Sequence, residues 1–256
     1  MLLVLDIGNT NIKTGLFEGG RLIHSWRLTT NFRFTSDEYG IQMEAFFGHL
    51  GISTSVVDGI IISSVSPSIN YTIEHMCRLF FHGITPMLVN HRMNTGFVNR
   101  YDHPETLGAD RICNAAAAFK LYGGPCIIID FGTATNLSVI SGGGEFLGGL
   151  ICPGIRISTE ALVESAAMLN KVEYVKPANV VCTNTEEAIR SGIINGFVGQ
   201  VEYIVKKVEQ EIGRKTRVIA TGGMSSMIAS ETDCIDVLAP TLTLEGLAIL
   251  YRLNAC

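Results

Sequence analysis

The chain carries one short pattern twice, at its beginning and near its midpoint. An apolar run leads into Asp6-Ile7-Gly8-Asn9-Thr10, and a second apolar run leads into Asp130-Phe131-Gly132-Thr133-Ala134-Thr135. Each run is typical of a buried strand, and the glycine after it lets the backbone turn sharply and approach a ligand closely. Backbone N–H groups in such a turn can cradle phosphate oxygens, and the aspartate can hold a metal ion or a water molecule. The duplication therefore predicts two related lobes that close on one nucleotide.

The bulk properties exclude several classes of protein. A chain of 256 residues can form one large domain or two small ones, and 47% hydrophobic with 17% charged residues predicts a globular protein. The net charge of −5, with no run of lysine and arginine, argues against nucleic-acid binding. The apolar runs are too short to span a membrane, and Met1 leads almost directly into the first strand, so we expect neither a membrane span nor a signal peptide.

The seven cysteines are scattered, and no two of them have the C-x-x-C spacing. A disulfide framework or a zinc site is therefore not expected. Buried free thiols in a reducing cytoplasm are favoured, and we expect a cytoplasmic protein. Cys113 and Cys152 lie near motifs discussed below, but neither has a base beside it in the sequence, so neither is expected to be a nucleophile.

Periodicity and turn residues predict an α/β protein in which hairpins come first and strands then alternate with helices. The expected strands cover residues 2–6, 12–17, 22–28, 59–65, 87–89, 126–130, 137–140, 145–147 and 217–220. The expected helices cover about 36–50, 67–81, 110–121, 185–212 and 243–253, with Ser36 and Thr185 as caps. The repeat places the lobes at residues 1–121 and 122–256, with a C-terminal helix that can pack back on the first lobe.

Other nucleotide motifs are missing from the sequence. A Walker loop and a G-x-G-x-x-G turn after a strand are both absent, and Gly213-Arg214-Lys215-Thr216 lacks the Gly-Lys step. Asp130-Phe131-Gly132 spells the magnesium motif of protein kinases, but the glycine-rich loop and the H-R-D loop of those enzymes are missing.

Two segments have two interpretations each. Lys13 can neutralise a phosphate or be an exposed strand residue. Gly108-Ala109-Asp110-Arg111 opens a helix, and spacing alone favours Asp110 as a helix cap. In the alternative, Arg111 keeps Asp110 ionised, so that its carboxylate can accept a hydroxyl proton. The run Ala115–Ala118 allows another helix to approach closely, either within the chain or at a dimer interface.

The remaining segments carry weaker signals. The glycine-rich stretch 148–154 is expected to be a permissive loop. Thr221-Gly222-Gly223 can lie against a flat ligand such as adenine or be a plain turn between a strand and a helix. Tyr101 is a candidate for lining a pocket, whereas His103 is more typical of a surface loop.

Taken together, these segments resemble the type III pantothenate kinases, a family of the actin-like ATPase superfamily. Five motifs match in order: Asp6-Ile7-Gly8-Asn9-Thr10, Gly108-Ala109-Asp110-Arg111, Asp130-Phe131-Gly132-Thr133-Ala134-Thr135, Gly148-Gly149 with Pro153-Gly154, and Thr221-Gly222-Gly223. The resemblance covers essentially the whole chain. It implies two duplicated actin-like, ribonuclease H-like lobes with the active site in the cleft between them.

The resemblance also implies an activity, which is transfer of the ATP γ-phosphoryl group to pantothenate as the first step of coenzyme A synthesis. It implies that ATP contacts Asp6, Ile7, Gly8, Asn9, Thr10, Asn11, Ile12, Lys13 and Thr133. It implies that pantothenate contacts Tyr101, Gly108, Ala109, Asp110, Arg111 and Thr185, with Asp110 as the proton acceptor. Asp130 would ligate a monovalent cation (K⁺ or NH₄⁺), Mg²⁺ would accompany ATP near Asp6, and the protein would be a homodimer.

Physical chemistry agrees with this assignment, because phosphoryl transfer needs positioning and charge neutralisation more than covalent chemistry. The resemblance, rather than the spacing, favours Asp110 as a base over Asp110 as a cap. Two alternatives stay open. One is a kinase of the same fold for a sugar or carboxylate substrate, and the other is a non-catalytic transcriptional accessory factor, which the complete motif set weighs against.

Overall fold

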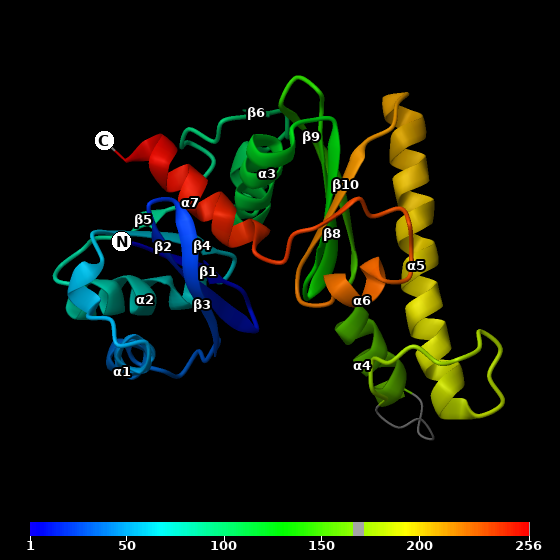
Figure 1. Cartoon of the computed structure of the whole chain (residues 1–256), viewed down its shortest axis with the longest axis horizontal. Coiled ribbons are helices and arrows are strands. Elements are labelled where there is room, and N and C mark those ends of the chain that lie inside the picture. The colour runs from blue at the N-terminus through cyan, green and yellow to red at the C-terminus, as the bar shows by residue number, and fades with distance from the viewer. Residues whose placement is uncertain (166–171, 256) are drawn as a thin grey trace. The chain divides into compact units, whose positions relative to one another are not determined.

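The computed structural model describes residues 1–165 and 172–255. The chain divides into two compact units: residues 1–121 with 241–256 form unit 1, and residues 122–240 form unit 2. Each unit has its own sheet with helices packed on it (Figure 1). The last helix, α7 (Leu242–Asn254), belongs to unit 1, where it packs on three strands of the first sheet.

Unit 1 begins with a three-stranded antiparallel meander, and two parallel strands extend its sheet. The strands are β1 (Leu2–Ile7), β2 (Asn11–Glu18), β3 (Arg21–Thr29), β4 (Gly59–Ser64) and β5 (Met87–Leu88), in the spatial order β3-β2-β1-β4-β5. Its other helices are α1 (Ser36–His49), α2 (Pro67–Phe80) and α3 (Ala109–Tyr122). The short strand β6 (Val98–Asn99) and the 3-10 turns Thr54–Val56 and Pro104–Thr106 lie in the connections.

Unit 2 repeats this plan. Its strands are β7 (Cys126–Phe131), β8 (Ala134–Ile140), β9 (Glu145–Pro153), β10 (Arg217–Thr221) and β11 (Val237–Leu238), and they follow the order β9-β8-β7-β10-β11. Its helices are α4 (Ile155–Ser165), α5 (Thr185–Ile212) and α6 (Ser225–Ala229). As in unit 1, the first three strands pair antiparallel and the last two join in parallel. The predicted fold class, with duplicated α/β lobes that each begin with hairpins, is confirmed.

The alternation of side chains between the two faces of β1 decides which of its residues enter the core of unit 1. Leu3, Leu5 and Ile7 of β1 lie in one buried cluster with residues of α1 and α2. Because successive side chains of a strand point to opposite faces, Asp6 lies on the other face of the sheet. That face is covered by α7, since Val4 of β1 and Leu244 of α7 both lie against Gly15. Asp6 is therefore directed away from the main core of unit 1.

Several expectations about local structure were wrong. Residues 148–153 are part of strand β9 rather than a loop, because they pair with β8 despite their glycines. The N-cap of α1 is Thr35, which forms a capping box with Glu38, rather than Ser36. The N-cap of α5 is Asn184 rather than Thr185, since the Asn184 side chain accepts from the backbone N–H of Glu187. Helices α4 and α6 and strand β11 had not been expected.

The alanine run of α3 packs inside the chain. Ala115, Ala116, Ala117 and Ala118 are all buried, so the proposal that they form a dimer surface was wrong. Helix α7 is the element that comes close, because a Cβ on Gly246 would collide with the carbonyl oxygen of Cys113. A buried hydrogen bond of 2.8 Å from Thr243 Oγ1 to Asn114 Oδ1 also joins the two helices.

The six cysteines that the structure describes are free thiols, as expected, and Cys256 lies outside the described residues. Burial raises the pKa of Cys77 and of Cys126 to about 12, so both stay protonated at neutral pH. Within the described residues, every helix is too short or too polar to cross a membrane.

Candidate active site

The first repeat forms a tight turn between β1 and β2. The backbone N–H of Gly8 donates to the carbonyl of Asn11 at 3.0 Å. Thr30, the residue that follows β3, stabilises the same turn with two hydrogen bonds. Its Oγ1 donates to the Gly8 carbonyl at 2.7 Å, and its N–H donates to the Thr10 carbonyl at 3.0 Å. The turn that follows Asp6 is therefore stabilised by its own hydrogen bond between β1 and β2 and by the two hydrogen bonds of Thr30.

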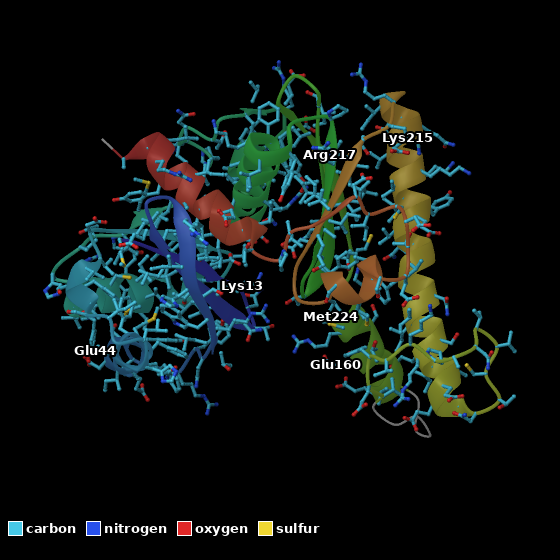
Figure 2. The ribbon with its side chains drawn as sticks, in the orientation of Figure 1. Lys13, Glu44, Glu160, Lys215, Arg217 and Met224 are labelled. Carbon is cyan, nitrogen blue, oxygen red and sulfur yellow. The ribbon has the colours of Figure 1, made fainter. Side chains whose placement is uncertain are left out.

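Asp6 stands in a row of three polar side chains across neighbouring strands. The strand register pairs Asp6 with Lys13 of β2 and with Ser63 of β4. One carboxylate oxygen, Oδ2, lies 3.6 Å from Lys13 Nζ, and the other, Oδ1, accepts from Ser63 Oγ at 3.2 Å. Lys13, which Figure 2 labels, keeps a quarter of its side chain exposed, so it is neither a plain surface residue nor fully buried.

Asp110 is the second residue of α3, so it lies inside the first turn rather than at the cap. Its Oδ1 accepts from the backbone N–H of Arg111 at 2.8 Å. The carboxylate folds back over Gly108, where a Cβ would lie only 2.5 Å from Oδ1. Asp110 can adopt this position because Gly108, the residue before α3, has no Cβ.

Arg111 is buried and contacts Tyr101. Its Nη1 donates to the Tyr101 hydroxyl at 3.4 Å, and its guanidinium lies 5.5 Å from the centre of the ring. Such stacking suits a planar guanidinium. The structure thereby brings together two residues that the sequence separates by a polar loop, and both had been predicted as contacts of one substrate.

The pKa of the buried Cys113 thiol responds to both Asp6 and Asp110. Burial raises the pKa of Cys113 well above its ordinary value, and the negative charges of Asp6 and Asp110 raise it further, while a hydrogen bond with Ser63 lowers it. Both carboxylates therefore lie close enough to one thiol to act on it electrostatically. Geometry also joins the turn after β1 to the start of α3, because the N–H of Val65 donates to the Ile7 carbonyl at 3.1 Å and Val65 Cγ1 would lie 3.8 Å from a Cβ on Gly108. Sequence reasoning missed Ser63 and noted Cys113 only as a cysteine near the Asp110 motif, because no spacing rule connects either residue to Asp6.

A Gly108→Ala variant tests the position of Asp110. The added methyl group would displace the carboxylate, and a displacement near 1 Å at a reacting group can cost ~10²-fold in rate. We expect a loss of that size in turnover with little change in melting temperature. Gly48→Ala in α1 is the matched control, because a Cβ there meets open space. Unchanged turnover in Gly108→Ala would show that the position of this carboxylate does not matter.

The second repeat forms the corresponding turn in unit 2, where the N–H of Gly132 donates to the carbonyl of Ala134 at 3.1 Å. Two other predicted motifs lie against this turn. A Cβ on Gly154 would collide with the carbonyl oxygen of Thr133. A Cβ on Gly222, which has a φ of +94°, would lie 2.5 Å from Asp130 Oδ1. Three motifs of unit 2 thus meet at the turn that follows Asp130.

The residues around Asp130 offer oxygen atoms that suit a cation. The strand register places Thr221 of β10 beside Asp130. Thr221 is fully buried, and among the described residues its Oγ1 has no hydrogen-bond partner. A carboxylate, a hydroxyl and backbone carbonyls form the oxygen donor set that hard cations prefer. Within the described part of the chain, histidine, cysteine and acidic side chains form no cluster of three or more that suits a metal ion.

The Asp6 carboxylate is the type of ligand that holds Mg²⁺ together with substrate phosphates, and in this structure its Oδ2 lies beside Lys13 Nζ. Thr185, the proposed contact of α5, is the exposed first residue of that helix.

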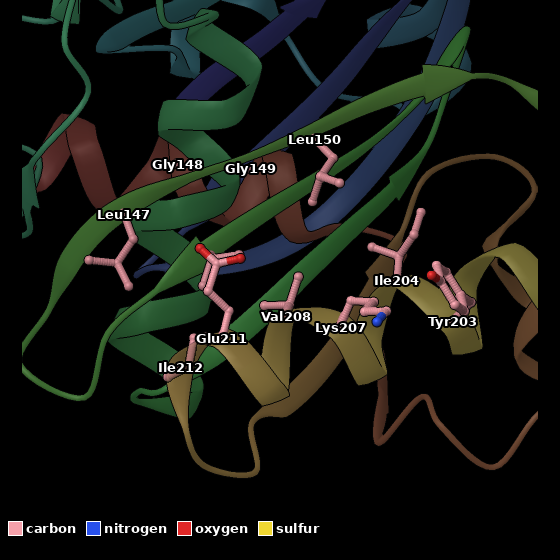
Figure 3. Close-up of a pocket in the computed structure, with 11 residues that line it drawn as sticks. Leu147, Gly148, Gly149, Leu150, Tyr203, Ile204, Lys207, Val208, Glu211 and Ile212 are labelled. Carbon is pink, nitrogen blue, oxygen red and sulfur yellow. The ribbon is translucent and has the colours of Figure 1, made fainter.

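Gly148 and Gly149 border a cavity of about 360 Å³ between β9 and the C-terminal half of α5 (Figure 3). Its walls are mainly apolar, with Lys207 and Glu211 as the charged residues.

Comparison with known proteins places this fold and these motifs among described families. The family model of type III pantothenate kinase matches residues 2–207. A Campylobacter jejuni protein described as a Baf family transcriptional activator is 18% identical, with a TM-score of 0.61 and coverage of 98% of this chain and 97% of that one. Component A of the Acidaminococcus fermentans (R)-2-hydroxyglutaryl-CoA dehydratase is 13% identical, with a TM-score of 0.56 and coverage of 98% and 96%. The activator of the Clostridium difficile 2-hydroxyisocaproyl-CoA dehydratase, with bound ADPNP, is 14% identical, with a TM-score of 0.53 and coverage of 98% and 93%.

Proposed function

The chain belongs to the type III pantothenate kinase family, and on this premise we propose that it transfers the γ-phosphoryl group of ATP to the terminal hydroxyl of pantothenate. The observation that supports the proposal most directly is the position of Val65, whose N–H donates to the Ile7 carbonyl at 3.1 Å beside the first turn, and whose Cγ1 would lie 3.8 Å from a Cβ on Gly108 at the start of α3. A phosphate turn and a candidate base within one small region are what this reaction requires.

In the proposed reaction, ATP binds the turn from Asp6 to Lys13 and Thr133. Mg²⁺, when bound with ATP, neutralises charge on the phosphates near Asp6. The oxygen of the pantothenate hydroxyl forms a bond to the γ-phosphorus, and Asp110 accepts the proton of that hydroxyl. The bond between the γ-phosphorus and the oxygen of ADP breaks, and ADP leaves. Gly108, Ala109 and Arg111 hold pantothenate at the start of α3, together with Tyr101, which is fixed by its contact with Arg111. Thr185 is proposed as a further pantothenate contact.

The acceptor is tested by an ATP-dependent phosphorylation assay with pantothenate and a panel of sugars and short carboxylates. We expect transfer to pantothenate and little transfer to the others. Transfer to a sugar or a carboxylate instead would assign a different substrate to the same fold. A protein that binds ATP but transfers phosphate to no compound would favour the accessory-factor alternative.

We also propose that Asp130 ligates K⁺ or NH₄⁺, which would offset phosphate charge. Activity is expected to depend on one of these ions at constant ionic strength, and Na⁺ should substitute poorly. Gly222→Ala should remove this response, because its Cβ would crowd Asp130 Oδ1 and the backbone of Phe131 at a residue whose φ is +94°. The melting temperature is measured on the same variant, and a lost response in a protein that stays folded is the result that supports a cation at Asp130. Gly199→Ala in α5 is the control, because a Cβ there meets open space and Gly199 lies outside the motifs of the site. Equal rates in Na⁺ alone would argue against a cation site at Asp130.

A homodimer remains part of the proposal, although not through the buried alanines of α3. Light scattering under assay conditions decides it, and an active monomer would be the contrary result.

A further inference from the structure

The two oxygens of the Asp6 carboxylate have different partners, which are Lys13 and Ser63. Lys13 holds Oδ2 from a long stem that keeps a quarter of its surface exposed, so it can swing toward another negative charge. Ser63 holds Oδ1 from a fully buried position on β4, with a side chain only one bond long. The two contacts differ in their freedom to move.

The surroundings of Ser63 close it off from water. Cys113 of α3 is fully buried beside it. Helix α3 is itself held at that residue, because α7 approaches it at Gly246 with no room for a Cβ. Ser63 therefore has a fixed position relative to Asp6, whatever Lys13 does.

We infer that Ser63 is a positioning residue, whose hydroxyl keeps Asp6 oriented toward the Mg²⁺ of bound ATP when Lys13 turns to the phosphates. This inference rests on the proposed function for the role of Asp6. A carboxylate rotates readily about its last torsion angle, so one neighbour must remain in place when the other leaves. Hydrogen-bond partners of a metal-binding carboxylate commonly contribute to affinity in this way.

The test is calorimetric titration of Ser63→Ala with ATP, with and without Mg²⁺, and in the absence of pantothenate. We expect the affinity for ATP with Mg²⁺ to fall by ~10–100-fold, the usual effect of losing such a partner, and the affinity for ATP alone to stay unchanged. Ser63→Cys puts a weaker donor in the same place. It should give an intermediate loss, and it decides the question if Ser63→Ala does not fold.

Ser64→Ala is the matched control. Ser64 is the next residue of β4 and faces the other way, where its Oγ bonds Asn70 Oδ1 at 2.5 Å. It should bind ATP with Mg²⁺ as the unaltered protein does. Unchanged Mg²⁺-dependent binding in both Ser63 variants, or an equal loss with and without Mg²⁺, would overturn the inference. Mg²⁺-dependent ATP binding without phosphorylation of pantothenate would instead overturn the proposed acceptor only.

Discussion

An Asp110→Asn variant is expected to phosphorylate pantothenate ~10²–10⁴-fold more slowly than the unaltered protein, the usual contribution of a general base. Asparagine has nearly the same size, so it should fit beside Gly108 as aspartate does. Its amide oxygen can also accept the hydrogen bond from the Arg111 N–H. The change therefore removes the proton acceptor and preserves the start of α3.

Three measurements on this variant separate catalysis from folding: turnover, melting temperature and affinity for ATP with Mg²⁺. Only turnover should change markedly. Asp37→Asn is a matched control, because Asp37 is likewise the second residue of a helix, α1, and is exposed. Nearly normal turnover in Asp110→Asn would leave Asp110 with a structural role at the start of the helix.

The second large effect is expected for Lys13→Met, which keeps the length of the side chain and removes its charge. Loss of one group that stabilises transition-state charge typically costs ~10²–10³-fold in rate. The KM for ATP should rise as well, whereas the KM for pantothenate should change little. Only 10% of the Asp6 side chain is exposed, so removal of its ion-pair partner should lower the melting temperature. Asp6 keeps its hydrogen bond from Ser63, so we expect the variant to fold, and its melting temperature is measured beside its kinetics.

Lys120→Met serves as the control for Lys13→Met, since Lys120 is an exposed lysine near the end of α3. Its kinetics should match those of the unaltered protein. If Lys13→Met keeps a normal KM for ATP and a normal rate, Lys13 acts only as a partner of Asp6 and not on the nucleotide.

The duplicated α/β fold could be predicted because its signals are local. An apolar run followed by Asp-x-Gly defines a strand and its turn within about eight residues. The positive φ angles of Gly19 and Gly20 likewise match the hairpin expected between β2 and β3. The prediction of a loop at 148–153 was wrong for the converse reason. Glycines weaken the local signal of a strand, and only pairing with β8 makes those residues one.

The sequence by itself therefore determined the repeated strand-turn units, the long helices and the positions of the motif residues. The tertiary structure alone decided which side chains meet. Register across three strands places Lys13 and Ser63 on either side of Asp6, and the pairing of β10 with β7 places Gly222 against Asp130. The physical reason is that periodicity and turn chemistry act between near neighbours in the chain, whereas register and packing join residues dozens of positions apart, for which a single sequence has no spacing rule.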